Sequence, residues 1–391
     1  MRTSVATRRI CTMFEPIFHC IEHHFGGDRV GLHEPVLGDV EKRYLNQVID
    51  SGFVSTAGEM VGQFERDVAH RVGSKHAVAV VNGTAALQLS LLACGVLPGD
   101  EVVTQSLTFI ATSNAIHQCG ASPVFVDVTS ENLGMSAAAL LRWLQENVEV
   151  VDGLPINHST GKVVRACMPM HTFGMSVEID AIQEMCRDYG IALVEDSAEA
   201  LGASFKGRSL GTFGQCGVFS FNGNKLITTG GGGMIVTDCD VIAAKTKHLS
   251  TTAKIDAYRH DVAAFNYRMP NLNAALGCAQ LTRIDDLLER KRNLAKAYEI
   301  AIGQVDGVEL LVGLPDGRSN NWLLNVLCDS VEIKESLSSQ AQQRNIQTRS
   351  VWQLLHQSAP YRHCQTGELR VCESVADRVL SLPSMPTSVS Q

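Results

Sequence analysis

The sequence predicts an α/β fold with a large domain on a mixed, mostly parallel sheet of seven strands, followed by a smaller α+β domain. From Lys75 to about Asp238, short apolar runs alternate with segments of helical periodicity. The connections between them are short, which implies parallel strands covered by helices on both faces. The chain also has 391 residues, too many for one simple core.

The expected elements follow in chain order. HAVAVV (76–81) is a strand, and the helix after it ends at Gly95. Strands are expected over 101–106, 122–128 and 163–170, with a helix over 109–119. A helix face formed by residues 182, 185, 186 and 189 stops at Gly190, and IALVED (191–196) is a buried strand. GVFSFN (217–222) and MIVTD (234–238) form a closing pair around four glycines.

Past Met269 the pattern changes. Apolar residues at helical spacing predict a long amphipathic helix over 280–305, with candidate strands over 321–329 and 346–352. We therefore expect an N-terminal extension over 1–30, a cofactor-binding large domain over 31–275 and a small domain over 276–391. We also expect Met13, not Met1, to be the natural start.

Composition excludes several classes of function. The net charge is −8 without a basic block, which disfavours nucleic acid as a partner. No apolar run approaches the roughly 20 residues of a membrane span. The twelve cysteines are scattered without a C-x-x-C pair, which indicates buried thiols in a reducing compartment and a cytoplasmic protein. His19, Cys20, His23 and His24 are interpreted as a partly exposed helix surface, so we expect no metal.

Three features carry chemistry. NGTAAL (82–87) follows a strand and opens a helix, where Gly83, the Thr84 hydroxyl and free N–H groups suit a phosphate, although a turn with an N-cap is equally compatible. Asp196, after Glu195, ends a strand and could cap the next segment or pair with a protonated ring nitrogen. Lys225 lies among small, uncharged residues, which favours an amine nucleophile over an ordinary surface lysine.

Together these features describe a site for pyridoxal 5′-phosphate (PLP). The lysine would bind the cofactor covalently, the carboxylate would keep its ring nitrogen protonated, and the helix start would hold its phosphate. Glycines 230–233 would let the backbone run close to the cofactor and a neighbouring chain. A P-loop is excluded because no G-K-[ST] follows these glycines, and no G-x-G-x-x-G opens a βαβ unit.

Ordered motifs over residues 30–385 resemble the DegT/DnrJ/EryC1/StrS family of sugar aminotransferases, which have the fold-type-I aspartate aminotransferase architecture. The motifs are SGFVSTAGEMVGQFE, NGTAAL, PGDEVVTQSLTFIATSNAI, PVFVDV, VEDSAEALGA, FSFNGNK, GGGGM, NYRMPNLNAALG and LSLPS. The resemblance implies that Lys225 is the Schiff-base lysine and Asp196 the partner of the pyridine nitrogen. It also implies a phosphate site formed by Ser220, Gly83, Thr84 and Ala85.

Further roles rest on the same resemblance. Phe109, otherwise a core aromatic, would stack on the cofactor ring. Asn266, otherwise a turn residue, would reach the phosphate of the neighbouring subunit's cofactor, which implies a homodimer. Glu199 departs from the glutamine or histidine of many relatives near the cofactor's phenolic oxygen, so a carboxylate there must be protonated, turned away or bridged.

HEPVLGD, the segment ENVEVVDGLPINHSTGKVV and NGNKLITTGGGGM with LSTTAK resemble the aminotransferases of legionaminic acid and bacillosamine biosynthesis. The implied acceptor is a UDP- or GDP-linked 2-acetamido-4-keto-2,4,6-trideoxyhexose for surface glycans, and the implied donor is L-glutamate. The alternatives are another 4-keto-6-deoxy sugar nucleotide, as in GDP-perosamine synthesis, or a PLP-dependent sugar dehydratase. The resemblance disfavours the dehydratase, because those enzymes replace the lysine with histidine.

Four residues are assigned to substrate binding: His171, Asn224, Arg349 and His356. His171 could equally be a structural histidine, and Arg349 could form a surface salt bridge. An amino-acid lyase or desulfurase remains a rival, although no cysteine lies in an evident catalytic loop. A non-catalytic regulator is a further rival, but it would normally have lost some of the anchoring residues, and Lys225, Asp196, Ser220 and Thr84 are all present.

Overall fold

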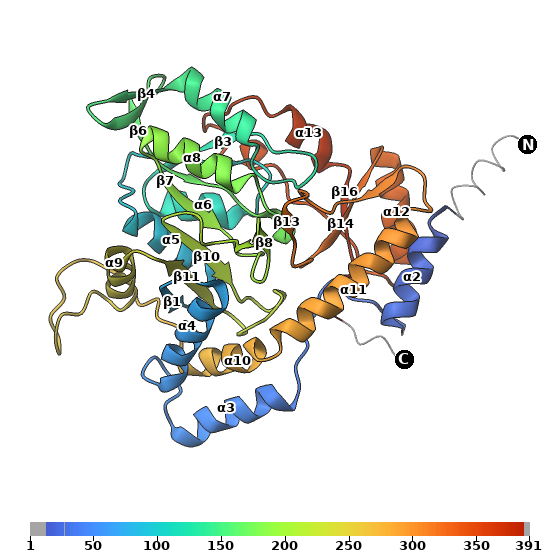
Figure 1. Cartoon of the computed structure of the whole chain (residues 1–391), viewed down its shortest axis with the longest axis horizontal. Coiled ribbons are helices and arrows are strands. Elements are labelled where there is room, and N and C mark those ends of the chain that lie inside the picture. The colour runs from blue at the N-terminus through green and yellow to red at the C-terminus, as the bar shows by residue number, and fades with distance from the viewer. Residues whose placement is uncertain (1–12, 27, 387–391) are drawn as a thin grey trace, which may run out of the picture.

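The computed structural model describes residues 13–26 and 28–386 (Figure 1). Its main sheet runs in the order β1-β11-β10-β7-β6-β2-β3. The strands are β1 (His76–Val80), β2 (Glu101–Gln105), β3 (Ser122–Val126), β6 (Lys162–Met168), β7 (Ala192–Asp196), β10 (Cys216–Ser220) and β11 (Gly233–Thr237). From β10 to β3 all neighbours are parallel, whereas β11 is antiparallel to both β10 and β1. The predicted mixed sheet of seven strands is confirmed.

A hairpin not predicted from the sequence extends this sheet beside β6. It consists of β4 (Val148–Val151) and β5 (Leu154–Asn157), and β5 pairs with β6 in antiparallel fashion. Asp152 and Gly153 form its turn, and both have positive φ. The hairpin accounts for the long segment between the helix α7 (Ala137–Asn147) and β6.

Helices cover both faces of the sheet, as the apolar strands require. Adjacent strand residues point to opposite sides: Val103 packs with α7 and α8 (Ile179–Tyr189), and Val102 packs with α5 (Gly83–Ala93) and α6 (Ile110–Gln118). Four further helices of the large domain are α3 (Asp39–Ser51), α4 (Glu59–Val72), α9 (Asp240–Ser250) and α10 (Asn271–Leu281).

The smaller domain is an antiparallel sheet in the order β12-β14-β16-β15. Its elements are β12 (Val308–Leu310), β14 (Leu324–Cys328), β15 (Arg349–Ser350), β16 (Val379–Leu382), α12 (Val331–Gln343) and α13 (Arg370–Ala376). The long helix α11 (Ile284–Ile302) joins it to the large domain (Figure 1). The helix predicted over 280–305 therefore starts four residues later, because α10 ends at Leu281. Of the strand expected over 346–352, two residues pair.

Short elements complete the chain. A second small sheet contains β8 (Ser204–Phe205), β9 (Arg208–Ser209) and β13 (Gly317–Arg318), and the 3₁₀ turns are η1 (Thr172–Gly174) and η2 (Leu355–Gln357). In the described ranges 13–26 and 28–386, no helix has the length and apolar character that crossing a membrane requires.

The N-terminal helix α2 (Glu15–Phe25) packs into the core of the small domain. Phe14, Ile17, Phe18 and Ile21 are buried there with residues of α11 and β14. The predicted division at residue 30 stays a prediction, although these contacts assign the described part of the extension to the small-domain core. The hypothesis that Met13 is the natural start concerns Met1–Thr12, which lie outside the described residues.

Candidate active site

A cavity of about 280 Å³ lies at the carboxyl ends of the central strands. Parallel strands bring their carboxyl ends to one edge, which is where open α/β sheets bind ligands. Nine of the thirteen residues predicted for the site line this cavity. They are Gly83, Thr84, Phe109, Asp196, Glu199, Ser220, Asn224 and Lys225 of the large domain and Arg349 of the small domain.

Asp196 is buried at the end of β7, with both carboxylate oxygens bonded. Thr112 Oγ1 donates to Asp196 Oδ2 at 2.7 Å, and the Ala198 N–H donates to Oδ1 at 3.2 Å. Burial raises the pKa of Asp196, while the Thr112 hydrogen bond and the Lys225 charge act in the opposite direction. The carboxylate is thus fixed in position and suited to pairing with a cationic ring nitrogen.

The adjacent Glu195 has a different, structural role. Its oxygens accept the N–H groups of Gly211, Phe213 and Gly214 at 2.6–2.8 Å, and Oε2 lies 3.1 Å from His171 Nε2. Because side chains alternate along a strand, Glu195 and Asp196 point to opposite sides of β7. The strand geometry therefore selects Asp196 for the cavity.

Lys225 follows β10 and reaches back into the cavity. Its Nζ lies 3.1 Å from Glu199 Oε1 and 3.7 Å from the ring centroid of Trp322. The side chain is 14% exposed, so its amine is accessible only from the cavity. A secluded amine beside a bound carbonyl compound can act as a nucleophile.

The role of Glu199 was left open by the sequence. In the structure each of its carboxylate oxygens accepts one hydrogen bond. Oε1 accepts from Lys225, and Oε2 accepts from the Phe173 N–H at 2.9 Å. Burial raises the pKa of Glu199, and the Lys225 charge opposes this rise. Phe173 adopts φ 56°, an unusual conformation for a bulky residue, which aims its N–H at Glu199.

The phosphate cradle lies where the start of α5 faces the end of β10. A Cβ built on Gly83 would lie 3.1 Å from Ser220 Cβ, so only glycine fits there without displacement. Ala85 is the exception among the predicted phosphate ligands: its N–H donates to the Asn82 side chain at 2.8 Å, and it does not line the cavity. The N–H groups of Gly83 and Thr84 and the hydroxyls of Thr84 and Ser220 are therefore the donors of the predicted cradle, and phosphate binding there stays a prediction.

Besides Ala85, three predicted residues lie away from this cavity. His171 is fully buried against Glu195, and His356 links Ser106 (2.7 Å) to Glu373 (3.2 Å). Their side chains connect protein segments and do not line this cavity, and their predicted role in substrate binding stays a prediction. Asn266, paired with Thr251 in a β-bridge, also does not line it, and its predicted partner-subunit role stays a prediction.

Sequence reasoning missed three residues at the site: Thr112, Trp322 and Trp352. Thr112 lies in the first turn of α6, three residues after its N-cap Phe109, and this nearness in sequence could have revealed it. Trp322 and Trp352 line the cavity from the small domain, nearly 100 or more residues from Lys225 in sequence. No local pattern indicates such a contact.

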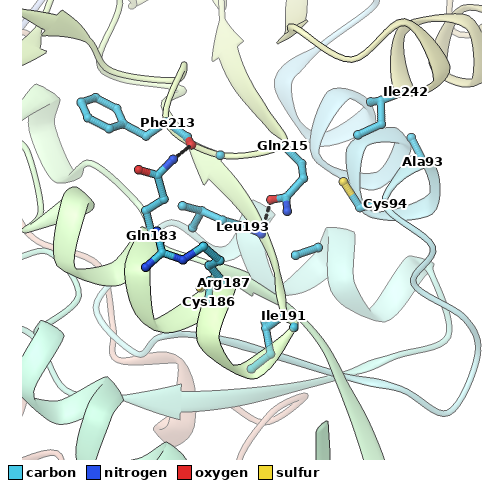
Figure 2. Close-up of a pocket in the computed structure, with 13 residues that line it drawn as sticks. Ala93, Cys94, Gln183, Cys186, Arg187, Ile191, Leu193, Phe213, Gln215 and Ile242 are labelled. Carbon is cyan, nitrogen blue, oxygen red and sulfur yellow. Dashed lines mark hydrogen bonds between the residues drawn. The ribbon is translucent and has the colours of Figure 1, made fainter. Parts of the chain in front are cut away.

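A larger hollow, of about 830 Å³, lies at the opposite edge of the sheet (Figure 2). Its polar side chains serve the fold: Gln183 Nε2 donates to the Phe213 carbonyl, and Gln215 Oε1 accepts from the Leu193 N–H at 2.6 Å. Arg187 there pairs with Glu184 and Asp188. Volume alone therefore does not identify the chemical site.

The smaller cavity fits PLP in three independent ways. It offers an accessible amine, a buried carboxylate and a glycine-lined helix start next to hydroxyl groups. This combination defines the site of a PLP-dependent transferase of the aspartate aminotransferase architecture. Comparison with known proteins identifies the family: the DegT/DnrJ/EryC1/StrS aminotransferase family model matches residues 35–390, and the chain belongs to this family.

Individual relatives agree with this membership. A GDP-perosamine synthase of Vibrio cholerae is 35% identical, over 91% of this chain and 94% of that protein. A GDP-perosamine synthase of Caulobacter vibrioides is also 35% identical, over 91% and 93%. The crystal structure of the aminotransferase TlmJ from Streptoalloteichus hindustanus superposes with a TM-score of 0.83 at 29% identity, covering 91% and 93% of the two chains. The chain is a PLP-dependent nucleotide-sugar aminotransferase.

Proposed function

We propose that this enzyme transfers an amino group from L-glutamate to the 4-keto carbon of a nucleotide-linked 4-keto-6-deoxyhexose. The observation that carries the proposal is the meeting of Lys225, Asp196 and the start of α5 around one cavity. Family membership supplies the sugar-nucleotide class of acceptor.

Each of the chain's residues has a distinct task in this proposal. When bound, the cofactor supplies a carbonyl carbon for amines and a ring that withdraws electrons. Lys225 Nζ would hold the cofactor covalently and, as a free amine, would take up and return the proton at the donor's α-carbon. Asp196 holds the proton on the ring nitrogen, and Glu199 Oε1 accepts from Lys225 Nζ while the amine is free.

The identity of the sugar is a finer question. The named relatives support the alternative of a GDP-linked 4-keto-6-deoxy sugar, as in perosamine synthesis, better than the 2-acetamido sugar of legionaminic acid or bacillosamine biosynthesis. We therefore place GDP-4-keto-6-deoxymannose first. The 2-acetamido sugar, which the resemblance of three sequence segments suggested, is the second candidate.

The biosynthetic role, the cellular location and the oligomeric state belong to the same proposal. A relative named for spore coat polysaccharide biosynthesis supports a role in making a surface polysaccharide. We propose a cytoplasmic homodimer with shared active sites, in which Asn266 contacts the cofactor phosphate of the neighbouring subunit.

The experiment that tests the function supplies pure protein with PLP, L-glutamate and either GDP-4-keto-6-deoxymannose or the UDP- and GDP-linked 2-acetamido-4-keto sugars. Mass spectrometry and NMR then detect new 4-amino sugars, and the Lys225→Ala variant is the negative control. Turnover of a 2-acetamido sugar alone would replace the first candidate by the second. A lack of product from every 4-keto sugar, with turnover of a plain amino acid, would contradict the proposal and favour a lyase.

A further inference from the structure

Trp322 forms the wall of the cavity directly against the Lys225 amine. The indole ring centroid lies 3.7 Å from Lys225 Nζ, within the range of a cation–π contact. Trp322 is 3% exposed, and it comes from the small domain, whereas Lys225 belongs to the large domain. The amine therefore lies between an aromatic face and the Glu199 carboxylate, which is 3.1 Å away.

The indole ring is held in this orientation at several points. Its Nε1–H donates to the Asn224 carbonyl at 2.6 Å, in the residue before Lys225. Phe173 stacks on it at a centroid distance of 6.2 Å and an interplanar angle of 30°. Both rings are buried, so the position of the indole is determined by contacts other than the lysine.

The Trp322 backbone is equally constrained. Its N–H donates to Asn320 Oδ1 at 2.9 Å, and its carbonyl accepts from Lys291 Nζ at 2.7 Å. Lys291 is fully buried on α11 and also donates to the Ser384 carbonyl. These bonds join the helix between the domains to the residue that contacts the reactive amine.

Such a rigid surface matters whenever the lysine amine is free, which occurs in both halves of the reaction. A transaminase alternates between a state with its lysine bound to the cofactor and a state with the amine free. A free lysine side chain has several rotatable bonds, and proton transfer requires its nitrogen near one position. The Lys225 amine contacts both Trp322 and Glu199.

We propose that Trp322 is a positioning residue for Lys225, holding the released amine against its indole face so that the amine is correctly placed for proton transfer. This inference rests on the proposed role of Lys225. It assigns to Trp322 a function in catalysis, through the lysine, that exceeds packing of the small domain.

The direct test is NMR of holoenzyme labelled with ¹³C at the lysine ε-carbon. Excess L-glutamate without acceptor sugar leaves Lys225 unattached, and the Lys225→Arg variant identifies its signal. The indole ring current should shift this signal upfield, Trp322→Leu should abolish the shift, and Trp322→Phe should retain part of it. An unshifted Lys225 signal in the wild-type protein would overturn the proposal without any variant.

Kinetics provide the second readout. We expect Trp322→Leu to lower kcat about tenfold while KM changes less than about threefold, and Trp322→Phe to recover most of the loss. Trp143→Leu is the matched control, because Trp143 is a buried tryptophan of α7 and should lower thermal stability with kcat retained. An unchanged kcat in Trp322→Leu, or an equal loss in Trp143→Leu, would refute the positioning role.

The proposed function is checked separately by borohydride reduction of the wild-type holoenzyme and peptide mapping. An unlabelled Lys225 peptide would refute the role of the lysine itself. A labelled Lys225 peptide together with an unshifted NMR signal would refute the inference on Trp322 alone.

Discussion

At the residue scale, the Asp196 carboxylate depends on a pair of hydroxyl groups. Thr112 Oγ1 donates to Asp196 Oδ2, and Thr108 Oγ1 lies 2.8 Å from Thr112 Oγ1. Thr112 has used its proton for Asp196, so Thr108 is the donor when a hydrogen bond joins the two hydroxyls. The single proton of Thr108 has a second acceptor, Met170 Sδ at 2.8 Å, but the hydroxyl oxygen is the stronger acceptor of the two. Hydrogen bonds aligned in this way polarise one another and favour the ionised carboxylate.

Replacing Thr112 with valine should therefore raise the pKa of Asp196 further, because the hydrogen bond that opposes burial is lost. A hydrogen bond to a charged group contributes about 1.5–3 kcal/mol. We expect kcat to fall about tenfold and the acid limb of the kcat profile to move to higher pH. Rate measurements over pH check this, with Thr112→Ser as the conservative control. An acid limb that stays in place would contradict it.

The second prediction at this scale concerns the buried side chain of His33 and the dependence of stability on pH. It is 8% exposed, and neither ring nitrogen has a hydrogen-bond partner in the described part of the chain. Burial, followed by the charges of Lys291 and Lys225, lowers its pKa well below the usual 6.5. Below pH 6.5 the unfolded chain binds a proton at His33 that the folded chain does not, so stability falls as pH decreases.

His33→Leu should remove this dependence. Between pH 6.5 and 5, the wild type should lose stability relative to the variant by about 1.4 kcal/mol per pH unit. Urea unfolding of both proteins at pH 7.5 and 5.5 measures the difference. Parallel losses in the two proteins would show that His33 takes up its proton in the folded state.

At the same scale, the sequence could identify those site residues that lie in continuous motifs. Lys225, Asp196 and Gly83 each follow a strand, and such ends converge in any parallel sheet. Trp322 and Trp352 could not be found, because the docking of the small domain brings them to the cavity. His171 was assigned to substrate from its strand end, but strand alternation at β7 gives it a buried partner in Glu195.

At the scale of elements, the start of α5 and the start of β11 approach each other unusually closely. A Cβ built on Gly233 would lie 2.4 Å from the Asn82 carbonyl oxygen and 2.9 Å from the Gly83 nitrogen. Both contacts are with backbone, which cannot rotate away. This proximity explains why a glycine stands where β11 begins, directly beside the proposed phosphate cradle.

Gly233→Ala should push the two segments apart. We expect a stability loss of about 1–3 kcal/mol and weaker PLP binding, because the N–H groups of the cradle move. Thermal unfolding and fluorescence titration with PLP measure the two effects. Gly223→Ala is the matched control for stability, since a Cβ there meets no atom within 4 Å. Equal behaviour of the two variants would rule out the close approach.

The strands and helices of the large domain were predictable from the sequence. The strands are short apolar runs, and the helices have apolar residues at helical spacing. The boundary between α10 and α11 was not predictable, since apolar spacing continues across Thr282 and Arg283 while the backbone turns. Thr282 Oγ1 donates to the Ala279 carbonyl, a local bond that competes with helix continuation. The hairpin β4–β5 was missed because its strands are only four residues each and three of the four residues of β4 are exposed.

At the scale of the whole molecule, a single chain supplies most of the residues proposed for the active site, but not Asn266. The cavity gathers the lysine, the carboxylate and the cradle. Asn266 lies outside it, on a loop with large exposed apolar side chains such as Ile255, Tyr258 and Val262. A loop of this kind is suited to contact a second copy of the chain.

Subunit complementation tests this arrangement. Lys225→Ala and Asn266→Ala should each be nearly inactive as homodimers. If Asn266 serves the neighbouring site, a mixed dimer contains one site with both wild-type residues and one site with both replaced. Random exchange makes half of the dimers mixed, so refolding an equal mixture should restore about a quarter of wild-type activity. If Asn266 acted in its own subunit, every site would carry one replacement and the mixture would stay inactive.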